Sequence, residues 1–112
     1  MVFTVSNIKP IFSTLPYNTR VLIRHRYNHF CISNITSNDT FITININRMI
    51  NEIYSSIIFI KNFEDIFIDH DTRLLRVIFN NNGNMLYYNV IDINTSRTNN
   101  EGIIILIVDL QS

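Results

Sequence analysis

The sequence predicts a mainly β protein: an antiparallel β-sandwich or barrel of about seven strands, with one short helix near residues 47–57. Short runs rich in Ile, Val, Phe and Tyr recur along the chain, and turn-forming residues separate them roughly every eight to twelve positions. Apolar and polar residues alternate within several of these runs. With two glycines and two prolines in 112 residues, Asn, Asp and Ser must form most of the turns.

Length, charge and cysteine content narrow the class of protein. A chain of 112 residues is expected to form one globular domain, residues 1–112, with its own core. Nine basic and nine acidic residues give a formal net charge of zero, so no long-range field draws the chain to nucleic acid or an anionic membrane. Cys31 is the single cysteine, which excludes an internal disulfide. The longest apolar run, residues 103–108, is too short to span a bilayer.

The first half of the chain contains several strand candidates. Residues 2–6 suggest an edge strand, and residues 19–33 fit either one long strand or two short ones. Residues 8–15 stay ambiguous because prolines interrupt and follow the segment. Residues 40–47 alternate between apolar and polar side chains, which predicts a strand that directs its three isoleucines inward.

Residues 47–57 favour a helix. Asn47 or Asn51 can cap its N-terminus. Apolar residues recur in this segment at helical spacing, namely Met49, Ile50, Ile53, Tyr54 and Ile57. Because isoleucine lowers helix propensity, a strand in the second half of the segment stays open as an alternative.

The second half of the chain is dominated by strand patterns. Residues 63–69 alternate, with Ile66 and Ile68 on one side. Residues 102–109 are apolar at six successive positions, which indicates a central strand that is covered on both faces.

Residues 73–92 predict a β-hairpin around Asn82-Gly83, the strongest short turn signal in the chain. If Asn82 and Gly83 form a two-residue turn, the numbers of any two residues that face each other across the hairpin sum to 165. This register places apolar pairs on one face and an ion pair at the open end. The expected pairs are Phe79 with Leu86, Val77 with Tyr88, Leu75 with Val90 and Arg73 with Asp92. A five-residue loop is the alternative.

We expect a non-enzymatic interaction or structural module that associates with itself as a homo-oligomer. No net charge opposes association, and the chain has more Ile, Phe and Tyr than so small a core needs. The expected interface residues lie on strand faces that could point outward: Phe63, Phe67, Tyr87 and Tyr88.

A small β-barrel that binds single-stranded nucleic acid is the first alternative. Cations interleaved with aromatic residues suit phosphates and stacked bases. The candidate residues are Arg20, Arg24, Arg26, Tyr27 and Phe30. The same pattern also fits a basic strand edge that prevents aggregation.

A metal-assisted hydrolase is the second alternative. Its candidate ligands or acid–base groups are His25, His29, Asp69, His70 and Asp71. On a strand, His70 would point away from Asp69 and Asp71, so the segment also fits a polar turn. Cys31 near His29 fits a buried small residue better than a nucleophile.

Several enzyme classes are excluded by what the sequence lacks. No P-loop, dinucleotide fingerprint, nucleophile elbow or zinc-finger spacing occurs, and two glycines cannot build a phosphate cradle. These absences exclude most nucleotide-dependent enzymes. We therefore expect the protein to use no cofactor.

Asn and Ile together form about a third of the chain, while Ala and Trp are absent and Lys occurs twice. In this composition the chain resembles proteins of large DNA viruses with AT-rich genomes, particularly those of insects. The resemblance covers the whole chain and rests on no motif. It implies an accessory or virion protein, and the absence of a recognisable signal peptide leads us to expect an intracellular location, in the cytoplasm or nucleus of a host cell.

Overall fold

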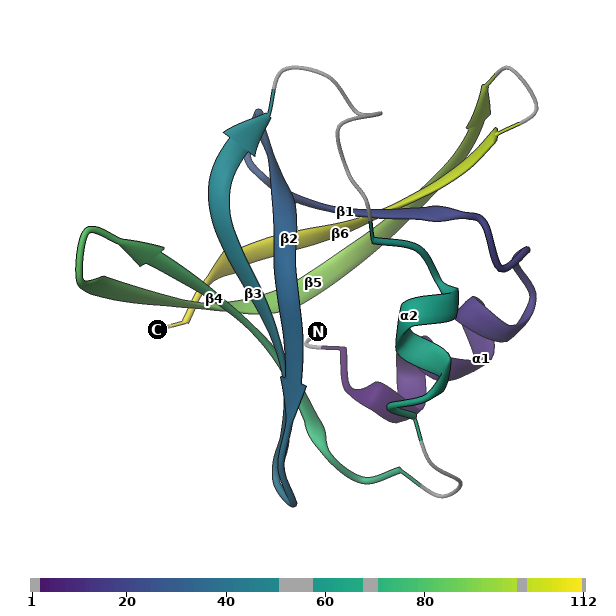
Figure 1. The fold of residues 1–112 in the computed structure, drawn as a ribbon, viewed down its shortest axis with the longest axis horizontal. Coiled ribbons are helices and arrows are strands. Elements are labelled where there is room, and N and C mark those ends of the chain that lie inside the picture. Colours follow the sequence, from purple (N-terminus) through teal and green to yellow (C-terminus); the bar gives the residue numbers. More distant parts are fainter. Residues whose placement is uncertain (1–2, 51–57, 68–70, 99–100, 112) are drawn as a thin grey trace.

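The computed structural model describes residues 3–50, 58–67, 71–98 and 101–111, which form a closed six-stranded β-barrel with two helices (Figure 1). The mainly β fold, predicted from the sequence as a sandwich or a barrel, is confirmed as a barrel. The helices are α1 (Val5–Ser13) and α2 (Lys61–Glu64). The strands are β1 (Arg20–His25), β2 (Asn28–Ser37), β3 (Phe41–Ile50), β4 (Leu74–Asn81), β5 (Asn84–Thr98) and β6 (Glu101–Leu110).

The sheet is mixed, unlike the antiparallel sheet expected from the sequence. Strands β1, β2 and β3 form one antiparallel meander, and β4, β5 and β6 form another. The two meanders join through parallel pairs, β3 with β4 and β1 with β6. A parallel pair needs a crossover connection, and α2 lies in the connection between β3 and β4. A helix followed by three strands thus occurs twice along the chain.

The helix predicted over residues 47–57 is wrong in the part that the structure describes. Residues 47–50 continue β3, where Met49 pairs with Phe30 and Ile50 pairs with His29. Cross-strand pairing with β2 outweighs the helical spacing there. Residues 51–57 lie outside the described residues.

Both helices replace expected strands. The edge strand expected over residues 2–6 gives way to α1, which begins where the Thr4 backbone N–H donates to Asn7 Oδ1 at 2.9 Å. The strand expected over residues 63–69 gives way to α2 and a turn, because Phe63 and Phe67 both pack on Phe12, with ring centroids 5.1 and 5.8 Å away. Helices α1 and α2 lie side by side against the barrel (Figure 1).

The main core fills the barrel and continues under the helices. Ile42, Ile44 and Ile46 are buried in it, as the alternation in residues 40–47 predicts. The run in β6 is buried on both faces: Ile104 and Leu106 face the main core, while neighbouring Ile103 and Ile105 belong to a second cluster with Leu22, Cys31 and Ile50. The prediction that residues 102–109 form a strand covered on both faces is therefore confirmed.

Within the described residues, no helix is both long and apolar enough to cross a membrane.

Candidate functional site

The β4–β5 hairpin has the register that the sequence predicts. Val77 pairs with Tyr88 and Phe79 pairs with Leu86. The turn residues Asn82 and Gly83 have φ angles of 51° and 92°, and two positive φ values in succession are what a type I′ turn requires. Its geometry matches the right-handed twist of the strands that it joins, so the hairpin can extend beyond the barrel wall (Figure 1).

Arg73 is not paired with Asp92, so the ion pair expected at the open end of the hairpin is wrong. Its guanidinium instead forms a two-point contact with the buried carboxylate of Asp71, at 2.9 Å from Nε to Oδ1 and 2.6 Å from Nη2 to Oδ2. The Arg73 Nη2 also donates to the Ile66 carbonyl oxygen at 2.6 Å. The hydrogen bond to Asp71 raises the pKa of Arg73, and burial opposes that rise. The contact ties the chain after α2 to the start of β4.

Exposed apolar side chains gather at the end of this hairpin and beside it. We call Met85, Leu86, Tyr87 and Leu110 the hairpin patch; their exposed fractions are 47, 37, 40 and 47%. Leu110 is brought to the hairpin because it pairs with Tyr88, and the Gln111 backbone N–H donates to the Tyr87 carbonyl oxygen at 2.9 Å. Leu86 and Leu110 share the face of Tyr88, whereas Met85 and Tyr87 lie on the other face. Both faces of the hairpin are therefore apolar at its end.

A fixed cation borders the outer face of the hairpin patch. The Arg76 guanidinium carbon lies 4.0 Å from the centre of the Phe41 ring and 5.9 Å from that of Tyr87. Arg76 Nε–H donates to Thr43 Oγ1 at 2.9 Å, which holds the side chain across β3, β4 and β5. Arg, Tyr and Met are enriched in protein interfaces. Sequence reasoning missed this group, because the pairing of β3 with β4 that brings Phe41 to Arg76 leaves no local signal.

The four residues predicted for an interface differ in their exposure. Phe63 and Tyr88 are buried, with exposed fractions of 1 and 4%, so neither can contact a partner without unfolding its surroundings. Phe67 is half-buried against Phe12 and Phe63. Tyr87 is exposed and belongs to the hairpin patch. The local alternation could not assign the faces correctly because both faces of these segments are apolar.

The arginine and aromatic residues of the nucleic-acid alternative do not form one groove. Phe30 is buried with its ring centre 5.2 Å from that of Phe79, so it cannot stack on a base. Arg20 lies at the other end of β1 from Arg24, about 13 Å away along the strand. Tyr27 is 96% exposed in the turn after β1, next to Arg26 at φ 57°. Only the turn retains the expected combination of cation and exposed ring.

The residues of the metal alternative also separate. His25 pairs with Asn28, and His29 pairs with Arg24. Because Asn28 and His29 are adjacent in β2, their side chains point to opposite faces, so His25 and His29 lie on different faces of the β1–β2 hairpin. His25 lies inside near Tyr88, with ring centres 5.0 Å apart, and 3.7 Å from the Asp109 carboxylate. Burial, and then the charge of Arg24, lower the pKa of His29.

Asp71 is occupied by Arg73, while Asp69 and His70 lie outside the described residues. Across residues 3–50, 58–67, 71–98 and 101–111, no three His, Cys, Asp or Glu side chains come together as metal ligands would. Cys31 is buried in the second cluster, as the sequence predicts for a small apolar residue.

Comparison of the chain with protein-family models, curated proteins and solved structures gave no match. The hairpin patch and its bordering arginine are the features of the described residues that bear on function.

Proposed function

We propose that this protein is a non-enzymatic β-rich interaction module that associates with a second copy of itself through the hairpin patch. The observation that carries the proposal is the clustering of Met85, Leu86, Tyr87 and Leu110 at the end of one projecting hairpin. Large exposed apolar groups that gather in one place usually mark an interaction site, whereas scattered ones need no explanation. The formal net charge of zero leaves no overall repulsion between copies.

The closed barrel supports association through side-chain faces. Each of its described strands pairs with a neighbour on both sides, although β2 after Phe30 and β5 after Tyr88 pair on one side only. The projecting hairpin supplies apolar contact area, and Arg76 supplies a cation that Phe41 and Thr43 hold in place. Aromatic residues and an arginine beside apolar side chains are typical of the centre of a protein interface.

The composition supports a place for this module among accessory or virion proteins of a large AT-rich DNA virus, where repeated copies of small proteins assemble. Its location would then be intracellular, in the host cytoplasm or nucleus.

Light scattering behind a sizing column, at low and high salt, tests the proposal. Wild-type protein is expected to elute as a dimer or larger at both salts, and the Tyr87→Lys/Leu110→Lys variant as a monomer. Loss of two apolar anchors weakens association by about 1–3 kcal/mol for each anchor. Tyr27→Lys is the matched control, because Tyr27 is more exposed yet lies outside the hairpin patch. A wild-type monomer at high concentration, or equal dissociation by the control, would contradict self-association.

A second candidate, weak binding of single-stranded nucleic acid by the β1–β2 turn, is supported by the exposure of Tyr27 beside Arg26. The same column run with a labelled oligonucleotide addresses it. Binding that falls with salt and is lost in Tyr27→Ala would favour this function, and absence of binding at low salt would exclude it.

A further inference from the structure

The turn of the β4–β5 hairpin contains a backbone nitrogen that can react with the side chain before it. Asn82 is the only asparagine of the sequence that is followed by glycine. Glycine has no β-carbon, so it opposes attack of its own nitrogen on the preceding side chain less than any other residue. Both Asn82 and Gly83 are exposed, and a β-carbon at Gly83 would meet no atom within 4 Å. Water and hydroxide can therefore reach the reacting atoms.

The reaction needs only water and hydroxide. Hydroxide takes the proton from the Gly83 nitrogen, which bonds to Asn82 Cγ. The Cγ–Nδ2 bond then breaks, and ammonia leaves with a proton that water returns, so a five-membered succinimide ring remains. Water next cleaves one of the two ring C–N bonds. Cleavage at Cγ gives aspartate, and cleavage at the backbone carbonyl carbon gives isoaspartate, in which the main chain runs through Cβ and Cγ.

The folded turn holds Asn82 away from this reaction. Ring closure brings Asn82 Cβ and the Gly83 nitrogen to the same side of the Cα–C bond. The φ values of 51° and 92° indicate a type I′ turn, in which ψ of the first turn residue is about 30° and the two atoms lie almost opposite each other. The Gly83 N–H also donates to Asn80 Oδ1 at 3.0 Å, a hydrogen bond that ring closure must break. The turn must therefore open before Asn82 reacts.

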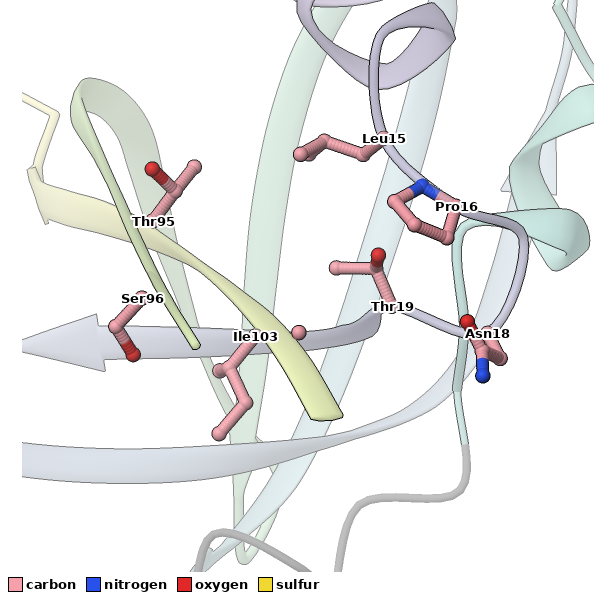
Figure 2. Close-up of a pocket in the computed structure, with 8 residues that line it drawn as sticks. Leu15, Pro16, Asn18, Thr19, Thr95, Ser96 and Ile103 are labelled. Carbon is pink, nitrogen blue, oxygen red and sulfur yellow. The ribbon is translucent and has the colours of Figure 1, made fainter. Parts of the chain in front are cut away.

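Asn18 gives a comparison within the described residues. It is also exposed, and Figure 2 shows it at the edge of the cleft between the segment after α1 and the β5–β6 hairpin. The next residue is Thr19, whose side chain is 1% exposed and whose backbone N–H donates to the Pro16 carbonyl oxygen at 3.1 Å. A buried, β-branched neighbour crowds the attacking nitrogen. Exposure alone therefore does not make an asparagine reactive, and Asn18 should react far more slowly than Asn82.

The reaction products would alter the hairpin patch, because two of its residues closely follow the turn. Met85 pairs with Asn80. Leu86 pairs with Phe79, in the register that the two-residue turn sets. Isoaspartate lengthens the main chain of the turn by one carbon, so the type I′ geometry that sets this register is lost. Either product also adds one negative charge to a chain whose formal net charge is zero.

We propose that Asn82 is a self-modification site that opening of the hairpin turn commits to a succinimide and then to isoaspartate or aspartate. The conversion loosens the end of the hairpin and marks copies of the protein whose turn has opened. Its effect on association rests on the proposed function, whereas the reaction and its control by the turn do not.

Peptide mass spectrometry of the full-length protein, aged in mildly alkaline buffer with and without guanidinium chloride, tests the proposal. Conversion is expected at Asn82, and it should be about tenfold faster in guanidinium chloride, because opening a folded segment costs free energy. Asn18 should stay unchanged in the folded protein. Asn80→Ala removes the acceptor of the Gly83 N–H and should speed conversion in buffer about fivefold, the effect of one hydrogen bond. Asn81→Ala, which changes an exposed neighbour, is the matched control and should leave the rate unchanged.

Equal rates with and without guanidinium chloride, or no conversion at Asn82 in either, would overturn the proposal. An unchanged rate in Asn80→Ala would also overturn it. The isoaspartate fraction, separated by ion exchange, gives a second readout: it should melt at a lower temperature than unmodified protein, and an equal melting temperature would contradict the loss of register. A monomeric wild type would contradict self-association only, because these readouts do not require a second copy.

Discussion

At the scale of single residues, Gly83 carries the turn of the β4–β5 hairpin. Its φ of 92° is a conformation that L side chains rarely adopt, while a β-carbon there would meet no atom within 4 Å. Gly83→Ala should therefore act through backbone strain alone and lower the free energy of unfolding by about 1–2 kcal/mol. Urea denaturation measures the loss, with Asn84→Ala as the control on the neighbouring exposed position. Equal stability of the two variants would contradict the strained turn.

His29 makes the stability depend on pH in a defined direction. Burial and the charge of Arg24 lower its pKa in the folded protein below the value of 6.5 that it has when exposed. Between these two pKa values the unfolded chain binds more protons than the folded one. His29 should therefore not reduce the free energy of unfolding above pH 6.5. As the pH drops from 6.5 toward the folded pKa of His29, the free energy of unfolding should fall.

An NMR titration of the His29 ring measures this pKa directly. We expect it below 6.5 in the wild type and closer to 6.5 in Arg24→Gln, which removes the nearby positive charge. His29→Gln should flatten the pH dependence of unfolding across the same window. A wild-type His29 that titrates above 6.5 would contradict the burial of its ring.

At the scale of elements, α2 is too short to persist without tertiary packing, and Phe63 supplies that packing. Phe63→Ala should lower the free energy of unfolding by about 3–5 kcal/mol, as for other buried phenylalanines. Phe67→Ala is the matched control from the same cluster, and its half-buried ring should contribute less. Urea denaturation compares the two, and a larger loss for Phe67→Ala would contradict this account.

The elements also show how far the sequence could be interpreted. The hairpin register and the strand over residues 40–47 were predictable, because alternation and the Asn-Gly turn act between neighbours in the chain. The segment over residues 63–69 was predicted wrongly, since its apolar residues fit both an alternating and a helical spacing. Contact with Phe12, about fifty residues earlier along the chain, favours the helix. Helix α1 was hidden by Pro10, which lies inside it.

The candidate sites were predictable only in part, for the same reason. Tyr87 was expected at an interface and is exposed, but Leu110 joins it through pairing of β5 with β6 that no local pattern encodes. Arg76 meets Phe41 across a parallel pair of strands. The burial of Thr19 depends on the surrounding structure, which its sequence neighbours do not indicate.

At the scale of the whole molecule, the six described strands close into a barrel, but neighbouring strands do not pair over their whole lengths. Strand β2 pairs with β1 only over residues 28–30, and β5 pairs with β4 only over residues 84–88, so the rest of each strand has one backbone neighbour.

The parallel pair that closes the barrel joins its first strand to its last. Arg20 in β1 pairs with Ile103 in β6, so β1 lacks one of its two neighbours until β6 has been synthesised. A nascent or truncated chain would expose that edge, together with the apolar residues that β6 covers. Open apolar edges are the surface from which β proteins aggregate. The last strand therefore protects the first, and an interrupted synthesis of this protein would be prone to aggregate.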